Sequence, residues 1–208
     1  MKAVLFDFDG TLVDTESTVL ASWQHLYEHS GHALDLDRWL ASVGGDVDDR
    51  YAALAELAGD GFDREAAHAL RREHELALVA DLPLRDGFAQ VLDRAAAHGL
   101  VLGIVSSSPA WWVRGHLERL GLLDRFSLVV TREDAVRAKP DPDLYLVALE
   151  RLGLPPEEVL VVEDSVNGVL AARAAGLNAV VVPNPVTARQ AHVVEVLEPT
   201  ALWDRIAR

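Results

Sequence analysis

The start of the chain and the part after residue 82 contain short continuous apolar runs, separated by stretches in which apolar residues recur with helical spacing. Apolar runs without polar alternation are typical of strands buried on both faces, as in a parallel sheet covered by helices. The pattern therefore predicts an α/β fold with an open sheet of five parallel strands. The predicted strands lie within residues 3–8, 101–108, 126–131, 158–165 and 178–184, and the predicted helices at 87–98, 109–120, 141–152 and 165–175, with a closing helical segment past 185.

Residues 15–82 break this alternation and contain no strand-like apolar run. Their helical stretches are separated by polar turns that contain glycine, such as SVGGDVD at 42–48. We therefore expect a helical unit at 15–82 that looks like a lid. It would be inserted into a core formed by residues 1–14 and 83–208. The predicted helices of this unit lie at 15–30, 35–41, 47–58 and 63–80.

The charge of the chain narrows the range of partners. The 208 residues carry a formal net charge of −14, which disfavours nucleic acid and anionic membranes as partners. The absence of cysteine excludes a disulfide framework and a thiolate nucleophile. The first apolar run stops at Asp7, and no run approaches the ~20 apolar residues of a membrane span. We expect a cytoplasmic monomer.

Chemically active side chains follow several of the predicted strands. In open α/β sheets ligands bind at the carboxyl ends of the strands. Carboxylates that converge there repel one another unless a cation lies among them, and oxygen ligands beside phosphate favour Mg²⁺. The alternative for the first pair is an acidic turn, because Asp-Gly is ordinary turn chemistry. The side chains are those of Asp7 and Asp9, Ser106 to Ser108, Glu163 and Asp164, with Lys139 in the connection between them.

Lys139 stands out against the composition of the chain. Of the 19 basic residues, 17 are arginine, and the lysines are Lys2 and Lys139. A compact ammonium can approach a carboxylate and a phosphoryl oxygen as a point charge, which a planar guanidinium does not do equivalently. The alternative is a solvated lysine in a loop before Pro140. The arginine bias favours a functional lysine.

Four of these segments resemble the motifs of the haloacid dehalogenase superfamily, in the same order. They are DFDGT at 7–11, Ser106 of VSS, Lys139 of AKPDP and VEDS at 162–165. The resemblance runs from Lys2 to about Pro183, and a helical insertion after the first motif is similar to the β-phosphoglucomutase-like branch. It implies a Rossmann-like core domain (1–14 and 83–208) with the catalytic site and a helical cap domain (15–82) for substrate specificity. It also implies a Mg²⁺-dependent phosphatase. The substrate would be a small phosphomonoester, of the sugar phosphate or phosphoglycolate type, hydrolysed through an aspartyl-phosphate.

Each motif residue has a role in this chemistry. Asp7 would attack phosphorus, and Asp9 would protonate the leaving oxygen and then deprotonate the hydrolytic water. Ser106 would donate to a phosphoryl oxygen, and Lys139 would complete the catalytic set. The resemblance also implies that the backbone carbonyl of Asp9 is a metal ligand. The predicted metal residues are Asp7, Asp9, Glu163 and Asp164, and the predicted substrate-binding residues are Thr11, Gly44, Gly45, Arg50 and Ser107.

Two other functions fit the same scaffold. A phosphosugar mutase would need a group that restrains Asp9, and the residue aligned with the histidine that mutases use there is Val19. Mutases also tend to carry an apolar residue at the position of Thr11, so both departures favour hydrolysis. A non-catalytic binding protein is disfavoured by the complete set of motif residues.

Three further features could carry function or only structure. His25, His29 and His32 could suggest zinc, but no acidic partner of the HExxH type follows, which favours a solvated cap face. Ser108 is expected to cap the following helix while Ser106 faces the site. For Trp111 and Trp112, core packing is favoured, with one ring free to face the site.

Overall fold

The computed structural model describes residues 1–41, 47–189 and 194–207. The described chain folds as two compact units, one formed by Met1–Asp14 with Pro83–Arg208 and the other by Thr15–Leu82. They are called here the sheet unit and the helical unit. The predicted substrate residues Gly44 and Gly45 lie outside the described residues.

Within the described residues of the sheet unit, five parallel strands form one sheet in the order β3-β2-β1-β4-β5, which confirms the predicted fold class. β1 is therefore the central strand, and its Ala3 pairs with Val101 on one side and with Val159 on the other. The strands are β1 (Ala3–Phe6), β2 (Val101–Val105), β3 (Leu128–Val130), β4 (Val159–Glu163) and β5 (Asn178–Val181).

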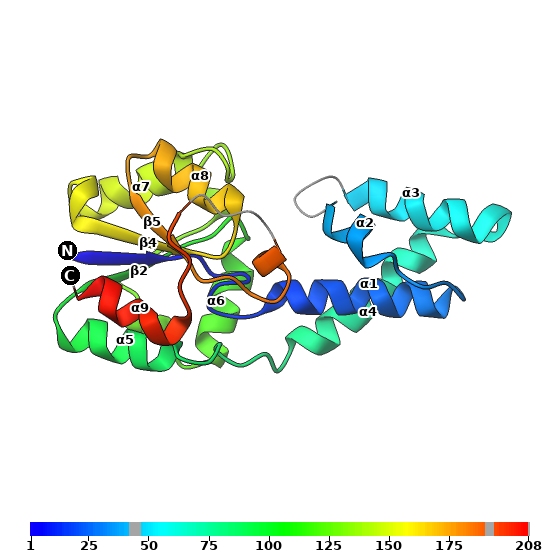
Figure 1. Ribbon diagram of the computed structural model, residues 1–208, viewed down its shortest axis with the longest axis horizontal. Coiled ribbons are helices and arrows are strands. Elements are labelled where there is room, and N and C mark those ends of the chain that lie inside the picture. Colours follow the sequence, from blue (N-terminus) through cyan, green and yellow to red (C-terminus); the bar gives the residue numbers. More distant parts are fainter. Residues whose placement is uncertain (42–46, 190–193, 208) are drawn as a thin grey trace. The chain divides into compact units, whose positions relative to one another are not determined.

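Helices cover both faces of this sheet (Figure 1). Val4 and Phe6 of β1 pack in one hydrophobic core, and Ala3 and Leu5 pack in the other. This alternation is the two-residue period of a strand that is buried on both faces. The first core takes in α5 (Phe88–Ala97), α6 (Ala110–Arg119) and α9 (Pro199–Ile206), and the second takes in α7 (Asp143–Leu152) and α8 (Val166–Ala174).

Phe6 shows how the core fixes the central strand. Its ring lies edge-on to Phe88 at 6.2 Å and to Phe126 at 6.4 Å between ring centroids. Full burial of such a side chain contributes about 1.5–3 kcal/mol, and each aromatic pair adds about 0.5–1.5 kcal/mol. β1 is thus held rigidly up to the residue before Asp7.

The helical unit consists, in its described part, of helices whose ends differ from the predicted ends by at most one residue. Trp23 and Tyr51 pack against each other in its interior, with ring centroids 4.7 Å apart. The buried Arg71 donates to Glu75 at 2.6 Å and to the Tyr51 hydroxyl at 2.9 Å, so its charge is compensated. The helices are α1 (Thr15–His29), α2 (Leu36–Ala41), α3 (Val47–Ala58) and α4 (Arg64–Val79).

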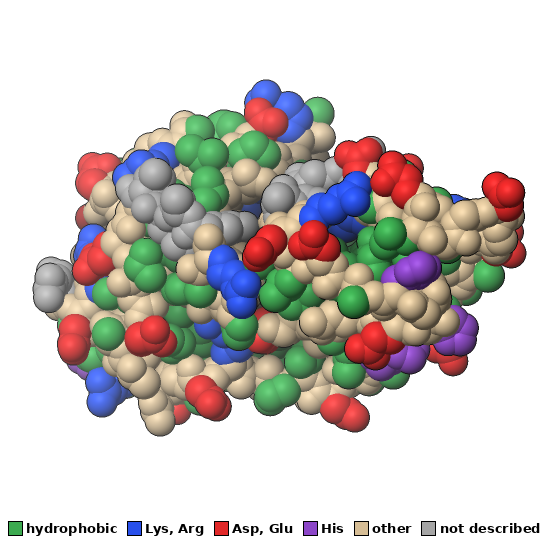
Figure 2. Space-filling view, turned by 45° about the vertical axis from the view of Figure 1, so that its right-hand side comes forward, with side chains coloured by type: hydrophobic (Ala, Val, Ile, Leu, Met, Phe, Trp, Pro, Cys, Tyr) green, Lys and Arg blue, Asp and Glu red, His purple; other side chains and the backbone are tan. Residues whose placement is uncertain are grey.

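The surface matches the acidic composition. On the face shown in Figure 2, acidic side chains are spread over the surface, and basic side chains lie between them singly or in small groups. Of the helices in the described ranges, none combines the length and the apolar character that crossing a bilayer requires.

Candidate active site

The site lies at the carboxyl edge of the sheet, where β1, β2 and β4 end side by side. Asp7 directly follows β1, Ser106 directly follows β2, and Glu163 is the last residue of β4. The Asp7 amide still donates to Val162 of the neighbouring strand at 2.9 Å, so its backbone is part of the sheet. Neighbouring parallel strands thus bring together side chains that are far apart in sequence.

Lys139 lies at the centre of this edge with its side chain only 7% exposed. Its Nζ donates to Asp7 Oδ1, to Glu163 Oε1 and to the carbonyl oxygen of Val105, each at 2.7 Å. Burial lowers the pKa of Lys139, but the attraction of the Asp7 and Glu163 carboxylates outweighs it and holds that pKa well above its ordinary value. Lys139 is therefore a fixed ammonium paired with Asp7.

Glu163 is held in place on all sides. Its Oε1 also accepts from the Tyr145 hydroxyl at 2.8 Å, and its Oε2 accepts from Ser165 Oγ at 3.3 Å. Gly168 in α8 leaves room for this carboxylate, because a Cβ at that position would collide with it. The carboxylate of Glu163 thus fixes Lys139.

Asp7 and Asp164 complete the cluster. Asp7 Oδ2 accepts from Thr11 Oγ1 at 3.1 Å, and Asp164 Oδ2 accepts from Asn184 Nδ2 at 2.7 Å. Burial, which outweighs the attraction of Lys139, raises the pKa of Asp7 to about 7.

The donor chemistry of this cluster fits a divalent cation. Among the described residues, the acidic group that could hold a metal is Asp7, Glu163 and Asp164, with one oxygen of each within 4.8 Å of the others. Three buried carboxylates outnumber the single ammonium of Lys139, so the cluster retains negative charge. Oxygen donors of this kind suit a hard divalent ion.

Asp9 is oriented by a different set of residues. Its Oδ2 accepts from Ser108 Oγ at 2.6 Å, and its Oδ1 accepts from the indole Nε1 of Trp112 at 2.9 Å. Ser106 Oγ is 3.5 Å from Oδ2, which is too long for a strong bond, and it accepts from the Ser108 amide at 3.0 Å. Ser107 Oγ accepts from the Lys139 amide at 3.3 Å.

The prediction that Ser108 caps α6 is wrong. The N-cap position of α6 is Pro109, without a side-chain cap, and the Ala110 amide donates instead to Glu133 Oε2 at 3.0 Å. A capping side chain stands at the N-cap position, whereas Ser108 lies one residue before it and its hydroxyl donates to Asp9.

The two tryptophans point in different directions. Trp111 is 66% exposed, whereas Trp112 packs against the first hydrophobic core and also donates to Asp9. Adjacent helical residues point about 100° apart, so only one of the pair can face inward. Trp112 therefore both packs against the core and contacts the site.

Sequence reasoning missed the residues that hold the loops of the site. The Arg85 guanidinium donates to the carbonyl oxygens of Gly10, Thr11, Val182 and Pro183, at 2.6 to 3.2 Å. It thereby ties the loop after β1 to the loop after β5. The chain has 17 arginines, and nothing in the sequence distinguishes Arg85 from the others.

Asn184, also missed, is a buried amide at the centre of a turn. Its Oδ1 accepts from the amides of Val186 and Thr187, both at 2.9 Å, while its Nδ2 donates to Asp164. The segment VPN reads as an ordinary proline turn. Nothing in that pattern indicates a hydrogen bond to Asp164.

The remaining sequence candidates belong to the helical unit. Arg50 is a partly buried residue of α3, and its guanidinium lies over the Trp39 ring, 5.3 Å from the centroid. A substrate role for Arg50, as for Gly44 and Gly45, stays a prediction. Val19 lies in α1.

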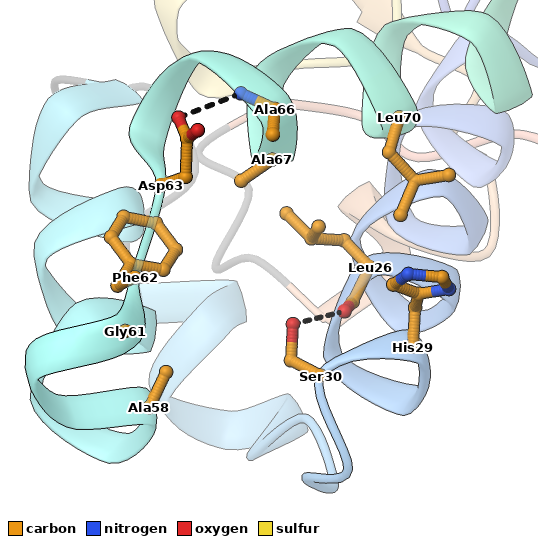
Figure 3. Close-up of a pocket in the computed structure, with 10 residues that line it drawn as sticks. All are labelled: Leu26, His29, Ser30, Ala58, Gly61, Phe62, Asp63, Ala66, Ala67 and Leu70. Atoms are coloured by element: carbon orange, nitrogen blue, oxygen red, sulfur yellow. Dashed lines mark hydrogen bonds between the residues drawn. The ribbon is translucent and has the colours of Figure 1, made fainter.

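Several histidines of the helical unit form ring contacts. His25 stacks on His74 with 4.0 Å between ring centroids, and neither belongs to a metal-capable group within the described ranges. His29 lines a cavity of about 400 Å³ together with Leu26, Phe62 and other residues (Figure 3). Most of the lining residues are apolar, and the polar groups Ser30 Oγ and Asp63 Oδ1 already have backbone partners.

Comparison with known proteins agrees with the motifs. The haloacid dehalogenase-like hydrolase family matches residues 1–176. The protein YhcW of Bacillus subtilis (strain 168) is 40% identical over 188 residues, which cover 90% of this chain and 86% of that protein. Fructose-1-phosphate phosphatase YqaB of Escherichia coli (strain K12) is 33% identical over 184 residues, with 85% and 94% covered.

A solved structure extends this agreement to the fold. The crystal structure of a HAD family hydrolase from Deinococcus radiodurans R1, with bound phosphate and sodium, superposes with a TM-score of 0.84 at 28% identity, over 100% of this chain and 95% of that chain. The four motifs, the sheet order and the relatives lead to one conclusion: the chain belongs to the haloacid dehalogenase-like hydrolase family.

Proposed function

We propose that this protein is a Mg²⁺-dependent phosphatase that hydrolyses a small phosphorylated carbohydrate through an aspartyl-phosphate on Asp7. The observation that carries the proposal is the arrangement of Asp7 beside Asp164, with one Asp7 oxygen bound by the buried Lys139. The name of the relative YqaB, a fructose-1-phosphate phosphatase, supports the substrate class.

Asp7 and Asp164 would hold the metal ion, together with the backbone carbonyl of Asp9 that the family resemblance implies. Glu163 would lie at the edge of this set, because both of its oxygens already accept hydrogen bonds. When bound, Mg²⁺ supplies positive charge that offsets the repulsion between the phosphate and the carboxylate nucleophile.

The first half of the reaction transfers the phosphoryl group to the protein. An Asp7 oxygen forms a bond to phosphorus while the bond from phosphorus to the leaving oxygen breaks, and the electron pair stays on that oxygen. Asp9 gives its proton to the leaving oxygen. Lys139 neutralises charge on Asp7 and on the transferred group, which is the main demand of phosphoryl transfer.

The second half returns the protein to its initial state. Asp9, now a carboxylate, takes a proton from water as the water oxygen bonds to phosphorus and the bond to Asp7 breaks. Inorganic phosphate leaves, and Ser106 can donate to its oxygens during both steps.

The mutase reaction is the alternative on this scaffold. Thr11 donates to Asp7 Oδ2 at 3.1 Å, and Val19 of α1 has no side-chain atom that can hydrogen-bond to Asp9. Both residues favour hydrolysis. If glucose 1-phosphate is accepted, we expect inorganic phosphate and no glucose 6-phosphate, measured with glucose-6-phosphate dehydrogenase. Sustained NADPH formation primed by glucose 1,6-bisphosphate would instead support the mutase function.

The test of the main proposal is the release of phosphate from p-nitrophenyl phosphate, with Mg²⁺ and with EDTA. We expect activity that EDTA removes and added Mg²⁺ restores, and no turnover by Asp7→Asn. A panel of phosphorylated metabolites, beginning with fructose 1-phosphate, then ranks substrates by kcat/KM. An inert wild-type chain in the presence of Mg²⁺ would overturn the proposal.

A further inference from the structure

Both carboxylate oxygens of Asp9 are engaged by the segment that begins α6. Ser108 Oγ donates to Oδ2 at 2.6 Å, and Trp112 Nε1 donates to Oδ1 at 2.9 Å. The three residues belong to the same compact unit. Two donors that bind the two oxygens of one carboxylate fix the plane of that group as well as its position.

The Trp112 ring is held so that its N–H points at Asp9. The ring packs against the first hydrophobic core and lies edge-on to His116, with 4.5 Å between centroids and 71° between planes. An indole N–H can only donate, so this contact can only hold an acceptor. Packing against the core uses only the apolar ring, so the N–H is a feature that the core does not require.

The backbone under Asp9 is already rigid. The Gly10 amide donates to the Val13 carbonyl at 2.7 Å, and the Leu12 amide donates to the Phe8 carbonyl at 2.9 Å, which closes a tight turn around Asp9. Ser108 and Trp112 therefore restrict the rotation of the Asp9 side chain. Within the described residues, Asp9 is not part of the metal-capable carboxylate group formed by Asp7, Glu163 and Asp164.

We infer that Trp112 is a positioning residue, which holds the Asp9 carboxyl group in the orientation from which it exchanges protons with the leaving oxygen and with water. The inference rests on the proposed phosphatase function, in which Asp9 is the general acid and base. Small losses of orientation are costly in proton transfer and positioning. Trp112 would act through Asp9 and would not touch the substrate.

The test uses two substrates that differ in their need for a proton. p-Nitrophenolate leaves readily without protonation, whereas the phenolate of phenyl phosphate is a poor leaving group, and the two substrates have similar shapes. In Trp112→Phe an aromatic ring remains, although it is smaller than the indole, and the N–H is lost. We expect kcat/KM for phenyl phosphate to fall about tenfold, and kcat/KM for p-nitrophenyl phosphate to fall less than about threefold.

Trp111→Phe is the matched control, because Trp111 is the exposed neighbour with the same chemistry. It should leave the ratio of the two kcat/KM values unchanged. Ser108→Ala, which removes the other donor to Asp9, should lower phenyl phosphate turnover selectively, as Trp112→Phe does, and it covers the case in which Trp112→Phe folds poorly.

The outcomes separate the inference from the function on which it rests. Equal losses for both substrates in Trp112→Phe and Ser108→Ala would show a structural role, and unchanged or increased values would show that the bond does not position Asp9. Each of these results overturns the inference and leaves the phosphatase proposal standing. A wild-type chain that hydrolyses neither substrate would overturn both.

Discussion

Lys139 is the residue on which the site depends most. Its ammonium has carboxylate and carbonyl acceptors at 2.7 Å on several sides, in a space that leaves 7% of the side chain exposed. A planar guanidinium would have to bring its nitrogens to acceptors that converge on one point. The chemistry therefore requires a lysine, and not merely a positive charge.

We expect Lys139→Arg to lower kcat by about 100-fold although the charge is retained, because the bonds to Asp7 and Glu163 cannot all be remade. Steady-state kinetics with p-nitrophenyl phosphate measures the effect. Lys2→Arg is the control, since Lys2 is the other lysine and its side chain is 63% exposed. Retention of most of the activity by Lys139→Arg would mean that Lys139 supplies only bulk charge.

Asn184 orients the Asp164 carboxylate. Its side-chain Nδ2 donates to Asp164 Oδ2 at 2.7 Å, and partners of this kind orient metal ligands. We expect Asn184→Ala to raise the Mg²⁺ concentration for half-maximal activity by about 10- to 100-fold. KM for substrate at saturating Mg²⁺ should change little, and an effect confined to KM would contradict the link between Asn184 and the metal.

At the scale of elements, α8 must approach β4 closely at Gly168. A Cβ at Gly168 would collide with the Glu163 carboxylate, whereas a Cβ at Gly115 of α6 would meet no atom within 4 Å. Both glycines lie within helices. The same substitution should therefore have opposite effects in the two helices.

We expect Gly168→Ala to destabilise the protein by about 1–3 kcal/mol, because the overpacked carboxylate must move. Gly115→Ala should instead stabilise it by about 0.5–1 kcal/mol through the better helix propensity of alanine. Urea unfolding measures both free energies. Stabilisation by both substitutions would show that α8 can shift without cost.

The elements themselves could be predicted from the sequence because apolar runs and helical spacing are local signals. The meeting of Asp7 with the residues that end β2 and β4 could also be predicted, because the carboxyl ends of parallel strands share one edge of the sheet. The contacts of Trp112, Arg85 and Asn184 depend on helix phase and loop path. No local pattern separates Trp112 from Trp111, or Arg85 from the other arginines.

At the scale of the whole molecule, the chain has two units with separate interiors, and the carboxylate cluster lies in the sheet unit. A ligand that binds only the folded protein stabilises it, by about 2.7 kcal/mol at 100 times its dissociation constant. A metal ion bound by Asp7 and Asp164 should thus stabilise the sheet unit directly.

We expect Mg²⁺ to raise the Tm of the wild-type chain and to slow hydrogen exchange in β1 and β4 more than in α1 and α4. Asp164→Asn should abolish both effects, because it removes one of the charged ligands. Thermal melts and hydrogen–deuterium exchange with mass spectrometry measure them. Equal protection of both units would contradict a metal site confined to the sheet unit.

The central position of β1 has a consequence for synthesis on the ribosome. β1 is translated well before its pairing residues Val101 and Val159, so Ala3–Phe6 have no sheet partners until those strands are made. Residues 15–82 can fold during that time, because their contacts lie within one stretch of chain. Proteolysis of nascent chains arrested before and after residue 159 should show early protection of 15–82 and late protection of β1. Asp7 and Asp9 directly follow the waiting apolar segment, and their negative charges disfavour its aggregation until the sheet closes around it.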